Sequence, residues 1–181
     1  MNQRSSITSI VLIALFAALT MLATMIKIPM PGAFVHLGNS VSLLAVLLIG
    51  YKRGALAGGL GFAIFDTLNG YVLEAPYFFV EPFIVGGAAA LVINFFHGKI
   101  DSARKILTLT IVAGITKIIM TQLKNTTIAL FAGSNFSVAF MAALSQLPAT
   151  LINTATTVAI VSLVYFPLKK AVDRTFSKTV L

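Results

Sequence analysis

Three charged side chains, Asp66, Glu81 and Lys117, lie inside stretches of the sequence that are otherwise apolar enough to sit in lipid. A charge within a bilayer is costly unless it is paired or lines a wet cavity, so such a residue indicates a functional site by default. Most of the other charges fall in short segments between the apolar stretches. The three residues are therefore predicted to bind or move something inside the membrane.

Polar and aromatic side chains near the same stretches extend the candidate site. Asp66 and Asn69 are three residues apart and share one helix face. A carboxylate and an amide together satisfy the donors and acceptors of a hydroxylated heterocycle, and a tyrosine such as Tyr71 or Tyr77 offers a ring to stack on. The full set of candidate substrate contacts is His36, Asn39, Asp66, Asn69, Glu74, Tyr77, Glu81 and Lys117.

Each of these groups also has a structural interpretation, and the sequence leaves both open. Asp66 and Lys117 could form a buried ion pair between two helices. Glu81 stands beside Pro82 near an expected helix start, where a carboxylate stabilises the positive helix end. Gln146 and Asn153 share a face of the last apolar stretch, and either line the cavity or bond to a neighbouring helix.

Composition places the chain in the membrane. It has 181 residues, of which 58% are hydrophobic and 10% charged, with a mean hydropathy of +0.98, whereas soluble domains carry about 25% charged residues. Crossing the hydrocarbon core takes roughly 20 residues. We expect an all-α bundle of six transmembrane helices in one domain, residues 1–181, with helices at about 7–26, 37–50, 54–70, 79–97, 104–123 and 138–166.

The basic residues indicate how the bundle is oriented. With both termini in the cytoplasm, every lysine and arginine except Lys27, Lys117 and Lys124 falls on the inner side, as the positive-inside rule requires. The net charge of +8 then reflects topology, and no nucleic-acid partner is expected. The N-terminal stretch is interpreted as a retained first helix rather than a cleaved signal peptide.

The connections on the outer side are longer than the inner ones. Segments 27–36, 71–78 and 124–137 contain proline, aromatic and amide residues, which is typical of loops that cover a binding site. The second helix is short, and Asn39 or Ser40 is predicted to cap it. A short helix whose positive end lies below the outer surface is one way to hold a polar ligand.

The sequence contains little that could perform catalysis. It has no cysteine, no glycine-rich phosphate loop, no paired-histidine metal motif and no nucleophile elbow. We therefore expect a protein that is not an enzyme, has no metal site and binds no cofactor. Any input of energy must come from a partner or from an ion gradient.

Small residues recur at helical spacing in two places. Ala14 and Ala18 lie one turn apart in the first helix, an arrangement that lets another helix approach closely. Gly50, Gly54 and Gly58 continue the same spacing into the third helix, joined by Gly59 and Gly61, and tight internal packing is expected there.

Taken together, these features resemble a known family. The six-helix topology, the alanine pair, His36-Leu37-Gly38-Asn39, the glycine series, Asp66 and Gly70-Tyr71 are similar to the S components of energy-coupling factor (ECF) vitamin transporters. The chain looks most like the branch assigned to riboflavin, pyridoxine and hydroxymethylpyrimidine. Many members have aspartate after His-Leu-Gly, whereas this chain has Asn39.

The resemblance implies a vitamin-binding subunit in a prokaryotic plasma membrane. Ala14 and Ala18 would dock a membrane coupling subunit (the T component), which joins two cytoplasmic ATPase subunits. ATP used by those partners would drive reorientation of the S component and delivery of the vitamin. The outer segments 27–38, 71–80 and 124–137 would cover the site.

The polar set and the absence of tryptophan favour a small hydroxylated ring, pyridoxine or hydroxymethylpyrimidine, as the substrate. Riboflavin is the alternative, because an isoalloxazine ring calls for a wider aromatic floor. A second alternative is a gradient-coupled secondary transporter in which Asp66 and Lys117 form a relay.

Overall fold

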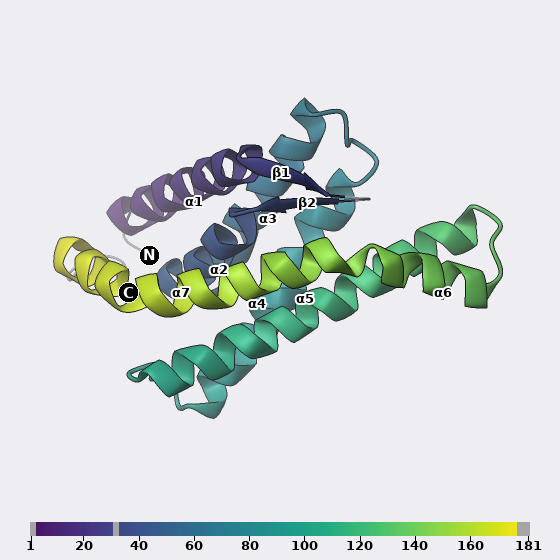
Figure 1. Ribbon diagram of the computed structural model, residues 1–181. Helices are drawn as coiled ribbons and strands as arrows, with labels where there is room; N and C mark the ends of the chain where they lie inside the picture. Colours follow the sequence, from purple (N-terminus) through teal and green to yellow (C-terminus); the bar gives the residue numbers. More distant parts are fainter. Residues whose placement is uncertain (1–2, 31–32, 177–181) are drawn as a thin grey trace.

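The computed structural model describes residues 3–30 and 33–176, and within them the chain forms seven helices and one β-hairpin. Lys178, one of the basic residues assigned to the inner side, lies outside the described residues. The elements shown in Figure 1 are, in chain order, α1 (Gln3–Met25), β1 (Lys27–Met30), β2 (Ala33–His36), α2 (Gly38–Ile49), α3 (Tyr51–Leu68), α4 (Ala75–Phe95), α5 (Ala103–Phe131), α6 (Phe136–Ser145) and α7 (Leu147–Phe176).

Four of the described helices are long and apolar enough to cross a membrane. They are α1, α4, α5 and α7, whereas α2 and α6 are apolar but short, with 12 and 10 residues. The expected all-helical membrane fold is confirmed at this level. The beginning of α1 and the end of α7 lie at the same end of the bundle (Figure 1).

The predicted last helix, 138–166, is divided into two. α6 ends at Ser145 and α7 begins at Leu147, with Gln146 between them. Pro148 follows directly, and a proline both disfavours helical conformation in the residue before it and lacks the N–H that would bond one turn back. The helix therefore restarts with Pro148 in its first turn, where a missing N–H does no harm.

The predicted loop 124–137 is mostly helix, since α5 runs eight residues beyond the expected end at 123. Its end is set by Gly133, whose φ of +91° favours glycine. The N–H of Gly133 donates to the carbonyl of Leu130, and the N–H of Ser134 to that of Ala129, which is the Schellman arrangement. Asn135 then caps α6 by accepting from the N–H of Val138 at 3.0 Å.

The predicted loop 27–36 contains the hairpin, in which Lys27 pairs with His36 and Ile28 with Val35. The predicted cap of α2 is wrong, because the N-cap residue is Leu37, whose side chain makes no capping hydrogen bond. The hairpin lies near the end of α1 (Figure 1). It therefore places His36 at the entrance to α2.

Helix α3 packs against α1, α2 and α4, while α5 packs against α4, α6 and α7. Close approach to α3 depends on its glycines. A Cβ at Gly58 would lie 2.1 Å from Ser42 Oγ, and one at Gly61 would lie 2.6 Å from the Ala17 carbonyl oxygen. The expected internal packing role of this series is confirmed for these two positions, whereas Gly50 forms the turn before α3 with a φ of +88°.

Candidate functional site

A cavity of about 580 Å³ opens between the hairpin, α3, α5, α7 and the turn after α3. Its walls carry five aromatic rings, those of Phe34, Phe62, Phe65, Tyr71 and Phe78. Phe65 and Tyr71 are stacked with centroids 6.4 Å apart, and Phe34 meets Tyr71 edge-on at 6.0 Å. Such a wall suits a flat conjugated ring, because aromatic pairs in offset or edge contact are mutually stabilising.

Lys27 occupies the space between three of these rings. Its Nζ lies 4.6, 5.0 and 5.5 Å from the ring centroids of Phe34, Phe65 and Tyr71, within the range of a cation–π interaction. Lys27 belongs to β1 and lines the cavity. A positive group is thus held at the hairpin side of the site.

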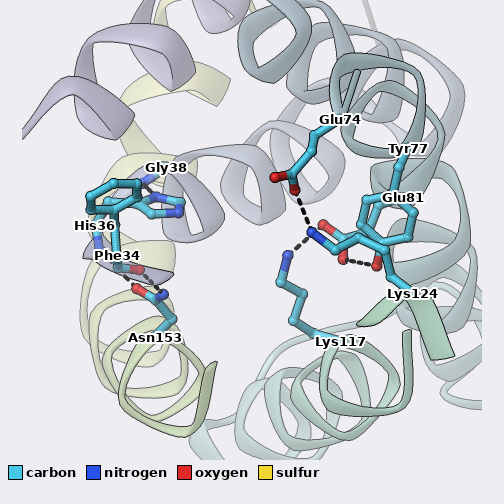
Figure 2. Close-up of polar contacts among 9 residues, drawn as sticks. All are labelled: Phe34, His36, Gly38, Glu74, Tyr77, Glu81, Lys117, Lys124 and Asn153. Carbon is cyan, nitrogen blue, oxygen red and sulfur yellow. Dashed lines mark hydrogen bonds and ion pairs between the residues drawn. The ribbon is translucent and has the colours of Figure 1, made fainter. Parts of the chain in front are cut away.

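Two ion pairs connect α5 with the chain segment that leads into α4 and with α4 itself. Lys117 pairs with Glu81, and Lys124 pairs with Glu74 (Figure 2). The Tyr77 hydroxyl donates to Oε1 of Glu81 at 2.7 Å. The side chains of Glu81 and Lys117 are 2% and 14% exposed, whereas Glu74 is 39% exposed. The Lys117–Glu81 pair is therefore the deep one.

A second, smaller cavity of about 40 Å³ lies beside the deep pair. Lys117 and Asn39 line both cavities, while Glu81 lines the small one. This volume is enough for about one to three water molecules. The Lys117–Glu81 pair thus lies between the large cavity and a small, mostly apolar space beside it.

Asn153 fastens the hairpin to α7 on the other side of the cavity (Figure 2). Its Nδ2 donates to the Phe34 carbonyl at 2.7 Å, and its Oδ1 accepts from the His36 N–H at 2.8 Å. The amide therefore uses a donor and an acceptor to hold one strand. The imidazole Nδ1 of His36 in turn accepts from the Gly38 N–H at 3.2 Å.

This arrangement keeps His36 neutral and gives a testable pH dependence. Burial, followed by the positive charge of Lys117, lowers the pKa of His36 from 6.5 to about 4. Between these values the unfolded chain binds more protons than the folded one, so stability falls as the pH drops. From pH 7 to pH 5 we expect His36 to account for a loss of about 2 kcal/mol.

Thermal unfolding in detergent at pH 7 and pH 5, compared between wild type and His36→Asn, measures this contribution. The variant should lose clearly less stability than wild type over this range. The exposed histidine His97 offers the control, since His97→Asn should leave the pH dependence as it is. An identical pH response in all three proteins would contradict the neutral assignment.

Five of the eight predicted contact residues line the large cavity: His36, Asn39, Asp66, Glu74 and Lys117. Ligand contact by these five remains a prediction. Tyr77 reaches the site through its bond to Glu81. Asn69 points back to its own helix, where its Nδ2 donates to the Phe65 carbonyl at 2.8 Å, a local side chain-to-backbone bond typical of asparagine.

Two structural interpretations of the charges are wrong. Lys117 pairs with Glu81 and not with Asp66. Glu81 is not a helix-end carboxylate, because α4 begins at Ala75 and Glu81 lies in its second turn. Pro76 occupies the first turn, so the helix starts earlier than Pro82 indicated.

The sequence reasoning missed most of the aromatic wall. Phe62 and Phe65 are three residues apart, and Asp66 follows one turn after Phe62. This spacing places all three on one face, and it is a usable signal. Lys27 and Lys124 were assigned to the outer side but not to the site. Phe34 and Phe78 carry no comparable signal, because their orientation depends on how the hairpin and α4 pack.

Among the described residues, no three of histidine, aspartate and glutamate come close enough together to hold a metal ion. The arrangement instead offers aromatic faces, hydrogen-bonding groups and paired charges around a cavity. This is the chemistry of a site that binds a flat polar molecule.

Comparisons with known proteins agree with this geometry. A family model described as ECF-type riboflavin transporter, S component, matches residues 4–171. Among solved structures, one described as the S component of a bacterial ECF transporter is similar over 96% of this chain and 99% of that chain, with 20% sequence identity and a TM-score of 0.60. No curated protein matches the sequence.

Proposed function

Because this chain belongs to the family of ECF-type riboflavin transporter S components, it is the substrate-specific membrane subunit of such a transporter, and we propose that its substrate is riboflavin. The observation that carries this proposal is the ring-lined cavity between the hairpin, α3 and α5. A flat vitamin would lie against the aromatic wall, and its polar edge would meet the charged groups.

The size and lining of the cavity support riboflavin over a smaller ring. Its volume of about 580 Å³ falls in the range of pockets that bind drug-sized ligands, roughly 300–1,000 Å³. Five aromatic side chains supply the wide floor that an isoalloxazine ring needs. The main sequence-based argument for a smaller substrate, the lack of such a floor, therefore no longer applies.

Pyridoxine and hydroxymethylpyrimidine are the second candidates. One observation favours them, namely that the carboxylate of Asp66 faces the cavity without an ion-pair partner among the described residues. A protonated ring nitrogen would compensate that charge. Either ring would fill much less of the cavity than riboflavin.

Mass spectrometry of small molecules retained by the purified protein identifies the ligand directly. Flavin fluorescence then measures the affinity, since stacking on aromatic rings quenches the emission and the chain contains no tryptophan. Quenching at nanomolar to micromolar riboflavin supports the proposal. Retention of pyridoxine or hydroxymethylpyrimidine with no flavin binding would overturn it in favour of the second candidates.

We further propose that transport requires a membrane coupling subunit and two cytoplasmic ATPase subunits, and that Ala14 and Ala18 form part of the docking face. Both alanines are exposed on the face of α1 that points away from the bundle, whereas Ala17 faces the bundle and is 5% exposed. Small exposed residues one turn apart permit close approach of another helix.

Because the proposed transport requires these partners, the chain alone in liposomes should show no sustained uptake when an ion gradient is applied. Gradient-driven uptake would favour a secondary transporter.

Bulky replacements on this face should separate docking from binding. Ala14→Trp or Ala18→Trp should lower the recovery of copurified coupling subunit roughly tenfold or more, because overpacking costs about 1–3 kcal/mol. Vitamin binding by the isolated subunit should be unchanged. Leu91→Trp on α4, at a leucine that is 70% exposed, serves as the control for a new indole on the lipid-facing surface. Intact complex with either alanine variant would show that this face does not dock a partner.

A further inference from the structure

Asp66 is an unusual member of the cavity wall. The residue is 5% exposed, it lines the cavity, and its Oδ2 is buried with no hydrogen-bond partner among the described residues. A buried polar group without a partner costs free energy, and a carboxylate costs more than a neutral group. Such a group requires an explanation beyond packing.

The charged neighbours of Asp66 are already engaged. Lys117 pairs with Glu81 of α4, and Lys124 pairs with Glu74 in the segment before α4. Lys27 lies against three aromatic rings. The described part of the protein therefore gives Asp66 no ion-pair partner, and we expect a hydrogen-bond donor from the bound molecule.

The neighbours of Asp66 in the chain fix where that donor lies. Phe65 precedes it and stacks on Tyr71, and the Tyr71 N–H donates to the Asp66 carbonyl at 2.8 Å. The turn after α3 thus folds back on the end of the helix, and Phe65, Asp66 and Tyr71 all line the cavity. A flat ligand lying on these rings would present its edge to the carboxylate.

We propose that Asp66 is the specificity-determining residue of the site, its carboxylate accepting a hydrogen bond from a ring N–H of the vitamin. The inference rests on the proposed function, and for riboflavin the donor is the imide N–H between two ring carbonyls. The binding of the ligand then satisfies Oδ2 of Asp66, which has no hydrogen-bond partner among the described residues. A charge-assisted bond in a low-dielectric cavity is stronger than one between neutral groups.

The test compares riboflavin with N3-methylriboflavin, in which the imide donor is blocked. Wild type should bind the methylated analogue about 10- to 100-fold more weakly, as expected for loss of one hydrogen bond to a charged group. Asp66→Leu should bind riboflavin more weakly by a similar factor and no longer distinguish the two flavins. Asp66→Asn keeps an acceptor, so its riboflavin affinity should lie between that of wild type and that of Asp66→Leu.

Stability of the empty protein separates recognition from a structural role. Without ligand, Asp66→Asn and Asp66→Leu should melt at or above the wild-type temperature, because each removes a buried charge that has no partner. Asn69→Ala, one turn away and directed at its own helix, is the matched control and should leave riboflavin affinity unchanged. A lower melting temperature of both Asp66 variants together with unchanged discrimination would show that Asp66 is structural.

The failure of this inference and that of the proposed function give different results. If wild type binds riboflavin tightly and binds the methylated analogue equally well, the inference is overturned while the function stands. If wild type binds no flavin, both are overturned.

Discussion

Replacing Lys117 by methionine should destabilise the protein by about 3 kcal/mol, because the change leaves the carboxylate of Glu81 buried without its cation. Glu81 is 2% exposed and, among the described residues, would keep only the hydrogen bond from Tyr77. The loss should be measurable as a lower unfolding midpoint in detergent. Vitamin binding should weaken as well, since Lys117 lines the large cavity.

A double variant distinguishes the ion pair from simple loss of the lysine side chain. Glu81→Gln combined with Lys117→Met removes both charges and retains an acceptor for Tyr77, so most of the lost stability should return. Equal stability of Lys117→Met and the double variant would show that no coupling exists between the two residues.

The second ion pair provides a matched control on the same helix. Lys124→Met also removes a lysine from a glutamate, but its partner Glu74 is 39% exposed. Water can solvate that carboxylate, so the loss should be about 1 kcal/mol or less. A loss as large as that of Lys117→Met would mean that burial does not determine the difference.

The pairing of these charges shows what the sequence could and could not predict. The positions of Glu81 and Lys117 within apolar stretches are enough to indicate a buried, functional region. Their pairing depends on the rotation of α4 against α5, which no local pattern encodes. The sequence pattern therefore left open a pairing of Lys117 with Asp66, whereas Lys117 pairs with Glu81.

Some helix boundaries could be predicted from the sequence and others could not. Hydrophobicity located α1 and most of α4, because membrane spans need long apolar runs. It did not locate the extension of α5, where Asn125, Thr126 and Thr127 are weak helix formers. In this segment Lys124 forms an ion pair with Glu74. Tertiary contacts of this kind can outweigh a helix-propensity deficit of a few tenths of a kcal/mol.

The polar residues of the candidate site, and the rings that share a helix face with them, could be predicted from the sequence. Spacing within one helix could place Asp66 and the rings of Phe62 and Phe65 on one face. The contributions of Lys27 and Phe34 arise from the hairpin, and its strands are short and contain Pro29, a residue that argues against a strand. The volume of the cavity, and hence the class of vitamin it suits, follows from packing between elements far apart in the chain.

The second large loss of stability is expected from a substitution at Gly54, one of the closely spaced glycines of α3. A Cβ at this position would lie 2.3 Å from both N and Cα of Val46 and 2.4 Å from the carbonyl carbon of Ala45. These are backbone atoms of α2, so no side-chain rotation relieves the contact, and α2 and α3 must separate. Gly54→Ala should therefore lower stability by about 3 kcal/mol despite the gain of about 1 kcal/mol in helix propensity.

Gly87→Ala is the control for Gly54, because a Cβ at Gly87 meets the Tyr51 hydroxyl oxygen at 3.3 Å. That atom is the far end of a side chain that donates to the Phe83 carbonyl at 3.0 Å, and a shift of a few tenths of an ångström relieves the contact, so the unfolding midpoint should change little. Since α2 carries Asn39 and α3 carries Asp66, both of which line the cavity, separation of these helices at Gly54 should also weaken vitamin binding. A Gly54→Ala protein with wild-type stability and affinity would mean that α2 and α3 do not approach each other this closely.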